Sequence, residues 1–286
     1  MTAIADPGTL GSAGTPAVTL PAPRPSAFHT NLNLTRELAV TSFKLKYTGS
    51  VLGYLWSLVK PLMIFGMMYL VFAVFLLRGR AGSDFPVQLL VGVVVWTFFA
   101  DATLTSVSSI ASNGHMILKA YFPRWILVVA STLSAAMTLA VNLTLMLAIG
   151  LPLHWFHVGW QTLLLPLLFV ELYLLILGVG LLWSALFVFY RDLGHVWEII
   201  LQLLFYGSAI VFPFILIPSR WQPWIALNPL AQIVEDMRRA LVSTTIPWSS
   251  GILGSRLAIP VIGVLVLFAL GAYTFRRLTP KFGEAL

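Results

Sequence analysis

The chain has 286 residues, of which 59% are hydrophobic and only 9% carry a charged side chain. Soluble domains carry roughly 25% charged residues, so this chain has too few charges to cover a water-soluble globule. The composition excludes an ordinary soluble protein and indicates a polytopic membrane protein. The net charge of +7 is spread among loops, without a basic stripe interleaved with aromatic residues, so we expect no nucleic-acid binding. The absence of cysteine excludes disulfides and thiolate chemistry.

The first part of the chain differs from the rest in composition. Residues 1–30 are rich in Ala, Gly, Thr and Pro, and we expect a disordered cytoplasmic tail because such a segment buries too little apolar surface to fold. Residues 31–50 follow as a predicted helix, since Leu34, Leu38 and Leu45 fall on one side of a helical wheel. We expect this moderately amphipathic helix to lie in the lipid headgroup layer. The alternative is that it packs against the spans of the protein itself.

Six apolar runs are long enough to cross a ~30 Å hydrocarbon layer as helices of about 20 residues. They are residues 57–77, 87–111, 126–151, 162–189, 197–217 and 257–275. With both termini inside, eleven Lys and Arg residues lie on the inner side and six on the outer side, which favours an N-in, C-in topology. The predicted fold is therefore an all-α integral membrane domain over residues 31–286, with Lys60 as an interface anchor at the foot of the first span.

The longest connection, residues 218–255, has its own predicted structure. Asn228 and Pro229 begin a short helix, because Pro costs no hydrogen bond at the first helical position and Asn can cap the free amides. Glu235 is spaced to pair with Arg238 and with the arginine after it. We expect an external gate helix that rests its apolar face on the outer leaflet. The prolines before it suggest a re-entrant segment, which protein or water must cover.

Enzyme motifs are absent from the sequence. There is no P-loop sequence, so the chain is not expected to bind ATP itself, and no zinc-protease or serine-hydrolase motif. His154 and His157 have a spacing that a metal could use. Their neighbours Trp155 and Trp160 favour an aromatic loop at the membrane interface instead. We therefore expect no metal site and no cofactor in this chain.

Two carboxylates, Asp101 and Glu171, lie inside predicted spans. A charge at mid-membrane costs at least ~2.5–3.5 kcal/mol, so each needs a polar partner, water or a proton. Each marks either a polar point on a translocation route or a hydrogen bond between helices. Aromatic side chains near span ends could stack on sugar rings, or they could belong to the lipid belt and the bundle interior. They are Trp56, Trp96, Phe98, Phe99, Trp183 and Tyr190.

Four separated segments carry a family resemblance. They are KYTGSVLGYLW from Lys46 to Trp56 with Lys60-Pro61 after it, MILKAYFPR from Met116 to Arg124, Tyr190-Arg191-Asp192, and Asn228-Pro229 with Glu235 and Arg238. They resemble the permease subunits of ABC-2-type exporters of cell-surface polysaccharides, such as O-antigen and teichoic-acid exporters. The resemblance covers nearly all of the chain beyond residue 30. Ala209 stands where many relatives have proline, so a kink in the fifth span is left open.

The resemblance implies a half-transporter without a catalytic role of its own. Two copies would form the pathway as a homodimer in the cytoplasmic (inner) membrane. Two copies of a separate ABC ATPase subunit, which would bind ATP and Mg, would dock on the cytoplasmic side. The implied substrate is a polysaccharide linked to a polyprenyl diphosphate lipid.

The resemblance also implies roles for particular residues. The cytoplasmic coupling helix of the family sits in a cleft of the ATPase. The residues that match it are Ile117, Leu118, Lys119, Tyr121, Phe122 and Arg124. The alternative is that they form an ordinary basic inner loop. Those on the substrate pathway are Trp56, Trp96, Phe98, Phe99, Asp101, Glu171, Tyr190 and Arg191. Arg191 would meet the diphosphate, unless it pairs locally with Asp192. Those of the external gate are Asn228, Pro229, Glu235 and Arg238.

Two other functions remain open from the sequence. One is a drug or lipid exporter of the same superfamily, against which the aromatic content and the Tyr190-Arg191-Asp192 segment favour a glycan. The other is an integral-membrane transferase that would use Asp101 or a histidine on a lipid-linked sugar. The transferase predicts turnover by the purified chain without ATP.

Overall fold

A computed structural model describes residues 27–48, 53–76, 83–119, 122–157, 159–243 and 245–285. Within these ranges the regular elements are all helical, and no strand is present. The α-helices are α1 (Ala27–Tyr47), α2 (Trp56–Tyr69), α3 (Phe85–Ser112), α4 (Gly114–Lys119), α5 (Trp125–Gly150), α6 (Leu165–Phe187), α7 (Leu193–Gly207), α8 (Gln222–Ala226), α9 (Pro229–Leu241), α10 (Ser249–Leu253), α11 (Ala258–Leu278) and α12 (Phe282–Ala285). The predicted tail lies almost entirely outside the described residues.

Five helical stretches in the described part of the chain are long and apolar enough to cross a membrane. They are Trp56–Leu76, Phe85–Ser112, Trp125–Gly150, Trp160–Phe187 and Ser249–Lys281. The first continues α2 through a π-helical segment, and the last joins α10 and α11 through a 3-10 turn. These stretches cover five of the six predicted spans.

The predicted fifth span is different in the structure. The prediction placed one helix over residues 197–217, but α7 ends at Gly207 and has 15 residues. At 1.5 Å per residue, α7 reaches about 22 Å, which is short of a ~30 Å hydrocarbon layer. After Ser208 the backbone of Ala209 is left-handed, with φ 52°, a conformation that costs energy for any residue with a Cβ atom. The kink therefore exists here without a proline.

The bundle is built around α3. Its sequence is apolar on all sides, as expected of a helix surrounded by protein, and it contacts α2, α5, α6, α7 and α9. In its most apolar part 78% of the residues are buried, whereas the corresponding value for Trp56–Leu76 is 11%. Helix α3 is thus the centre of the molecule, and the first span lies at its edge.

The helices α6 and α11 cross at very short distance because glycines meet there. A Cβ atom added to Gly178 would lie 2.8 Å from the backbone of Phe268, and one added to Gly271 would collide with the Gly178 carbonyl. Small residues at such crossings let helix backbones approach closely in membranes. This contact holds the last span against the bundle.

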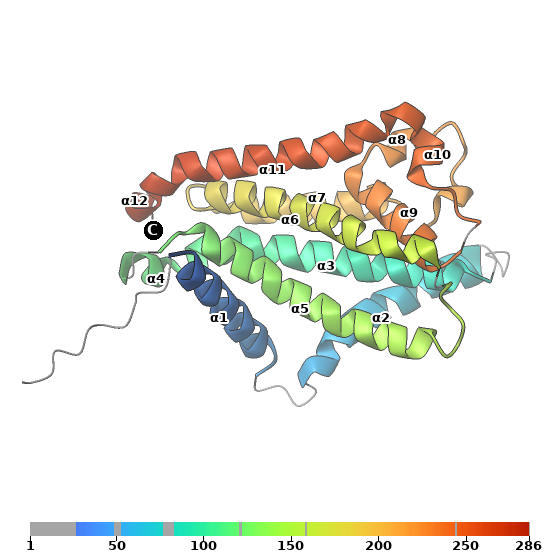
Figure 1. Cartoon of the computed structure of the whole chain (residues 1–286), viewed down its shortest axis with the longest axis horizontal. Coiled ribbons are helices and arrows are strands. Elements are labelled where there is room, and N and C mark those ends of the chain that lie inside the picture. Colours follow the sequence, from blue (N-terminus) through green and yellow to red (C-terminus); the bar gives the residue numbers. More distant parts are fainter. Residues whose placement is uncertain are drawn as a thin grey trace, which may run out of the picture.

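Figure 1 shows that the short helices gather at the two ends of the bundle. The helices α4 and α12 and the start of α1 lie at one end, and α8, α9 and α10 lie at the other.

One side of α1 contacts α5, where Ala39 is fully buried, while Leu32 and Leu45 remain exposed. The predicted helix is present, and its contact with α5 matches the alternative of packing against a span.

The predicted external gate helix corresponds to α9, but its surroundings differ from the prediction. The sequence predicts a short amphipathic helix that rests its apolar face on the outer leaflet. Instead α9 contacts α3, α6, α8 and α11, and it is buried on its polar side as well as its apolar side. Ile233 and Arg238 are both 0% exposed, and Glu235 is 1% exposed.

Candidate functional site

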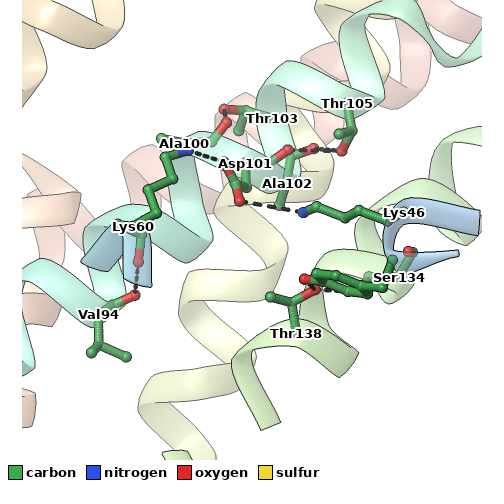
Figure 2. Close-up of polar contacts among 12 residues, drawn as sticks. Lys46, Lys60, Val94, Ala100, Asp101, Ala102, Thr103, Thr105, Ser134 and Thr138 are labelled. Atoms are coloured by element: carbon green, nitrogen blue, oxygen red, sulfur yellow. Dashed lines mark hydrogen bonds and ion pairs between the residues drawn. The ribbon is translucent and has the colours of Figure 1, made fainter. Parts of the chain in front are cut away.

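A charged cluster lies on the side of α3 that faces α1 and α2. We call Lys46, Lys60 and Asp101 the lysine cluster. The Nζ atom of Lys60 lies 2.7 Å from Oδ1 of Asp101, and the Nζ atom of Lys46 lies 3.4 Å from Oδ2. Figure 2 shows the two lysines reaching the carboxylate from opposite sides. Two ammonium groups share one carboxylate, so the cluster carries an excess positive charge.

The local sequence holds both lysines in place. Tyr47 is buried, and its hydroxyl lies 3.3 Å from Oγ1 of Thr138 on α5, which fixes the end of α1 beside the cluster. Lys60 precedes Pro61, which is the buried residue of α2. The sequence predicts a polar role for Asp101, a lipid-anchor role for Lys60, and for Lys46 only a place in a family motif. The sequence shows that both lysines are basic. It does not show that they share Asp101, which lies 41 residues after Lys60 and 55 residues after Lys46.

The depth of the lysine cluster follows from the length of α3. The apolar part of this helix begins at Phe85, directly after the polar residues Ser83 and Asp84. Asp101 lies 16 residues further, or about 24 Å at a rise of 1.5 Å per residue. A hydrocarbon layer of ~30 Å that begins at Phe85 would therefore end a few ångström beyond the cluster. The lysines are at the level where hydrocarbon gives way to headgroups, on the α4 side.

Three adjoining cavities, each of about 370 Å³, run along the same side of the bundle. The middle one is lined by the lysine cluster together with Trp56, Phe98 and Thr138. The hydroxyl-rich one includes Ser108, Ser112, Asn113, Ser131 and Ser134. The apolar one includes Leu62, Phe65, Leu90, Val94, Met146 and Trp155. Lys46 lines both the middle and the hydroxyl-rich cavity, and Pro61 lines both the middle and the apolar cavity. We call the three together the groove.

The predicted pathway aromatics divide between the groove and the core. Trp56 and Phe98 line the groove. Trp96 and Phe99 are 7% and 2% exposed, and their rings contact each other in a tilted arrangement with centroids 5.9 Å apart. Figure 1 places their helix α3 at the centre of the bundle. These two rings therefore present almost no face to a ligand in this chain.

The predicted pathway residue Glu171 lies on α6 against the buried helix α9. Its neighbours there are Gln232 and Asp236, and its Oε1 atom has no hydrogen-bond partner among the described residues. The amide of Gln232 donates to Oδ2 of Asp236 at 2.9 Å. Glu171 and Asp101 therefore belong to two separate polar sites of the bundle.

Tyr190 and Arg191 lie in the turn between α6 and α7, at the α4 end of the bundle (Figure 1). Both are exposed. The guanidinium carbon of Arg191 lies 5.5 Å from the centroid of the Phe187 ring. No ion pair joins Arg191 to Asp192 in the described structure. The arginine is thus accessible from the aqueous side of this end.

The predicted coupling segment is packed against the last turns of the chain. Phe122 and Ile117 pack on a cluster that contains Phe282. Arg124 donates from Nη1 to the carbonyl of Thr279, and its guanidinium lies 5.8 Å from the Phe282 ring centroid. The side chains of Leu118 and Lys119, and all of Tyr121, lie outside the described part. Movement of this segment would therefore be transmitted to α11 and α12 through these contacts.

The predicted gate residues surround the break after α7. Asn228 caps α9, because its Oδ1 accepts from the Leu230 amide at 3.0 Å, while its Nδ2 donates to the Ser208 hydroxyl at 2.8 Å. Pro229 is the first residue of α9, so the predicted start of this helix is confirmed. The side chains of α9 reach across to the non-helical backbone that follows α7.

Arg238 donates hydrogen bonds to carbonyl groups of the non-helical backbone that follows α7. It donates to the Ala209 carbonyl at 2.9 Å and to the Ile210 carbonyl at 2.5 Å. It also donates to the Gln88 carbonyl of α3 at 2.9 Å and pairs with Glu235 at 3.1 Å. The ion pair predicted from the spacing is confirmed for Arg238. Irregular backbone inside a membrane protein needs such internal partners.

Burial raises the pKa of the Glu235 carboxyl, while the adjacent Arg238 guanidinium and the Phe214 amide oppose that rise. Burial also raises the pKa of the Asp236 carboxyl, against hydrogen bonds from Gln232 and Ser249. Burial thus disfavours the charged form of both carboxyls, and the hydrogen bonds and the guanidinium beside them offset part of that penalty. The charged forms of these two α9 carboxyls therefore depend on their present hydrogen-bond and ion-pair partners.

The two histidines of the predicted interfacial loop differ in their surroundings. The Nδ1 atom of His157 lies 2.6 Å from the Val242 carbonyl, so this ring is tied to the end of α9. His154 has a left-handed backbone with φ 54°. No group of three or more metal-ligating side chains is found in the part of the chain that the structure describes.

Comparisons with known proteins show the family of this chain. Residues 33–242 match the family model described as ABC-2 type transporter. The O-antigen export system permease protein RfbA of Klebsiella pneumoniae is 26% identical, covering 85% of this chain and 91% of its own. The Myxococcus xanthus protein of the same name is 23% identical over 87% and 94%. The polysialic acid transport protein KpsM of Escherichia coli is 28% identical over 67% and 74%. The chain is a multi-pass membrane protein that belongs to the ABC-2 type transporter family.

Proposed function

We propose that this chain is the permease subunit of an ATP-driven transporter that exports a cell-surface polysaccharide across the inner membrane. The observation that carries the proposal is the similarity, over most of both chains, to permeases named for O-antigen export and for polysialic acid transport. Both named substrates are polysaccharides. The class of substrate is therefore proposed here, and the particular polymer is not.

ATP hydrolysis is assigned to a separate subunit, because the chain contains no P-loop sequence. The segment from Ile117 to Arg124 is proposed as its docking site. Its position at one end of the bundle supports this role, and so does its contact with α12. A push on this segment would reach the last span through Arg124 and Thr279.

A homodimer is proposed as the transporting unit. Helix α7 exposes a row of large apolar residues at helical spacing, which is available to a second copy: Val196, Ile199, Leu203 and Tyr206. The first span is also largely uncovered within one protomer. Two such protomers, with two ATPase subunits, would enclose the transport path between them.

The export proposal is tested by depleting the chain in its source organism. The expected result is loss of a surface polysaccharide and accumulation of that polymer inside the cell, attached to a lipid. Normal surface polysaccharide, together with a new sensitivity to drugs, would instead identify a drug exporter. Turnover of a lipid-linked sugar by the purified chain without ATP would identify a transferase.

Coupling is tested in a purified complex with the ATPase subunit. Phe122→Ala and Arg124→Ala are expected to lower ATP hydrolysis of the complex, because both residues position the docking segment. Lys281→Ala is the matched control, since this cation is exposed near the same end. Equal hydrolysis in all three variants would refute the proposed docking site.

A further inference from the structure

We infer that the protein binds an anionic phospholipid of the surrounding membrane in a slot between α5, α6 and α11. The slot is a cavity of about 300 Å³, and its lining includes Trp125, Val129, Leu181, Phe268, Ala272 and Arg276. No residue of the slot lines the groove. The inference goes beyond the proposed function, because it concerns a lipid of the membrane and not the exported molecule.

The shape of the slot suits an acyl chain. Leu181 of α6 is buried, whereas Trp125 of α5 and Arg276 of α11 are exposed, so α6 forms the floor and the other two helices form the walls. Along α11 the lining runs from Phe268 to Arg276, eight positions apart, or about 12 Å along a helix. Every lining side chain other than Arg276 is aliphatic or aromatic. The slot is therefore an apolar channel along the bundle that ends at one cation.

The charge at that end favours an anionic headgroup. Arg276 is exposed and makes no ion pair with any residue in the described part of the chain. Its guanidinium presents N–H donors in a fixed fork that matches phosphate oxygens, so a phosphate here would accept charge-assisted hydrogen bonds. Arg277 follows in the same last turn of α11. Two adjacent cations attract a net negative headgroup and repel the choline cation of a zwitterionic one.

The depth of Arg276 matches that of a lipid phosphate. The residues between Arg256 and Arg276 carry no charge, and the two arginines are 20 positions apart. This separation is about 30 Å along a helix, the thickness of the hydrocarbon layer. Arg276 thus lies at the boundary of this layer on the α4 side (Figure 1), where tryptophans such as Trp125 are also enriched. A lipid whose phosphate meets Arg276 would place an acyl chain beside Val129 and Phe268.

A lipid in the slot would also support the neighbouring docking segment. Trp125 directly follows Arg124. Phe275 lines the slot and contacts Phe282 with ring centroids 5.6 Å apart, and Phe122 packs on the same cluster. A ligand that binds only the folded chain stabilises it. The phospholipid is therefore expected to raise the unfolding midpoint of the protein.

Two other occupants compete with an anionic phospholipid. One is bulk lipid, which covers any apolar helix face in a membrane without regard to the charge of its headgroup. The other is a second copy of the chain, which would bury the slot in a dimer and would need no phosphate. The three occupants differ in their dependence on the headgroup and on Arg276.

The test titrates lipids against the full-length chain in a neutral detergent and counts bound molecules by native mass spectrometry. The probes are dioleoyl phosphatidylglycerol, dioleoyl phosphatidylcholine and glycerol phosphate. Arg276→Gln removes the cation, and Ala272→Phe fills the slot. The matched controls are Arg277→Gln and Leu270→Phe, because both positions are exposed on α11 and neither lines the slot. Thermal unfolding with and without phosphatidylglycerol reports whether each variant is folded and whether the lipid stabilises it.

Phosphatidylglycerol is expected to bind more tightly than phosphatidylcholine and to weaken about tenfold in Arg276→Gln, the loss expected for one charge-assisted hydrogen bond. Ala272→Phe is expected to weaken its binding at least as much, because the new ring takes the space of the acyl chain. Both controls are expected to keep the original affinity. Phosphatidylglycerol is expected to raise the unfolding midpoint of the original chain and the controls by more than that of Arg276→Gln.

Equal binding of phosphatidylglycerol and phosphatidylcholine would overturn the inference in favour of bulk lipid. Equal losses in Arg276→Gln and Arg277→Gln would overturn it in favour of diffuse attraction, and glycerol phosphate binding as tightly as the lipid would indicate a site for soluble anions. A dimer that Ala272→Phe separates, with lipid binding unchanged, would assign the slot to a second copy. If Ala272→Phe does not fold, the comparison of the two arginine variants decides. The measurement needs neither the ATPase nor the polymer, so its failure leaves the export proposal standing.

Discussion

Replacing Arg238 is the most severe single perturbation that the structure predicts. This guanidinium is fully buried, and it donates to three backbone carbonyls as well as to Glu235. Removing one partner of a buried ion pair costs about 3–5 kcal/mol. Each buried carbonyl left without a donor costs about 1–3 kcal/mol. These costs overlap, because water can enter the space that is left, so we take ~4 kcal/mol, the middle of the ion-pair range, as the net cost.

The assay is thermal unfolding of detergent-solubilised protein, followed by size-exclusion chromatography. A change of 1 kcal/mol shifts the midpoint by about 2–4 °C in domains slightly smaller than this chain, so Arg238→Met is expected to lower it by roughly 10 °C. Arg239→Met is the matched control, because the neighbouring arginine is less buried and makes only weak contacts, a hydrogen bond to the Ser243 carbonyl at 3.4 Å and a position 5.8 Å from the Trp248 ring centroid, among the described residues. It is expected to change the midpoint by much less.

A second variant separates the two costs of losing Arg238. Adding Glu235→Gln to Arg238→Met removes the unpaired carboxylate, so the double variant is expected to be more stable than Arg238→Met alone. The reasoning would be refuted if Arg238→Met and Arg239→Met unfolded at the same temperature. It would also be refuted if the double variant were the less stable one, since the carboxylate would then not be the source of the cost.

Three further changes test the packing around α9 and α11. Gly92→Ala is expected to destabilise the protein by displacing Arg238, because the new Cβ would lie 2.5 Å from its Nη2 atom; an unfolding midpoint at or above that of the original chain would contradict this. Gly271→Val is expected to separate α6 from α11 at Gly178, which thermal unfolding and protease sensitivity of the last span would report. Asp236→Asn is expected to flatten the pH dependence of stability. Burial raises the pKa of the Asp236 carboxyl, so this group's favourable contribution is complete below its unfolded pKa near 4 and is lost as pH rises through the folded pKa. Unfolding midpoints from pH 4 to 8 would show identical slopes in both proteins if this reasoning were wrong.

The sequence predicts the long spans well because their signal is local. A run of apolar residues with polar ends, such as residues 87–111, fixes the length of a helix to within a few residues of the observed Phe85–Ser112. The start of α9 is also local, since the capping group of Asn228 and the ring of Pro229 act within one turn. Such features need no knowledge of the rest of the molecule.

The break after α7 could not be predicted from hydropathy. Residues 197–217 read as one apolar run, and the expected proline is replaced by Ala209. The break is stabilised by Arg238 and Asn228, which are donors from another helix. These partners lie 20 to 29 residues further along the chain, so a local hydropathy pattern does not show them. The same reason explains the wrong environment predicted for α9: its helical wheel shows a polar side, but not that this side meets backbone instead of water.

The candidate site was predicted in part. Asp101 stood out because a carboxylate inside an apolar run needs a partner. The partners Lys46 and Lys60 were visible only as basic residues at the foot of a span. Trp96 and Phe99 were chosen for their ring chemistry, and their burial in the core follows from the central place of α3. Ring chemistry alone does not tell which side of a helix faces a neighbouring helix.

The central claim is that the α4 end of the bundle faces the cytoplasm, where an ATPase can reach it. Because the chain has no cysteine, single cysteines can be placed at His115 on α4 and at Arg220 near α8, both of which are exposed. The measurement is labelling by a membrane-impermeant maleimide in right-side-out membrane vesicles. The account predicts that His115→Cys reacts only after the vesicles are opened, while Arg220→Cys reacts at once. Immediate labelling of His115→Cys and protection of Arg220→Cys would contradict it.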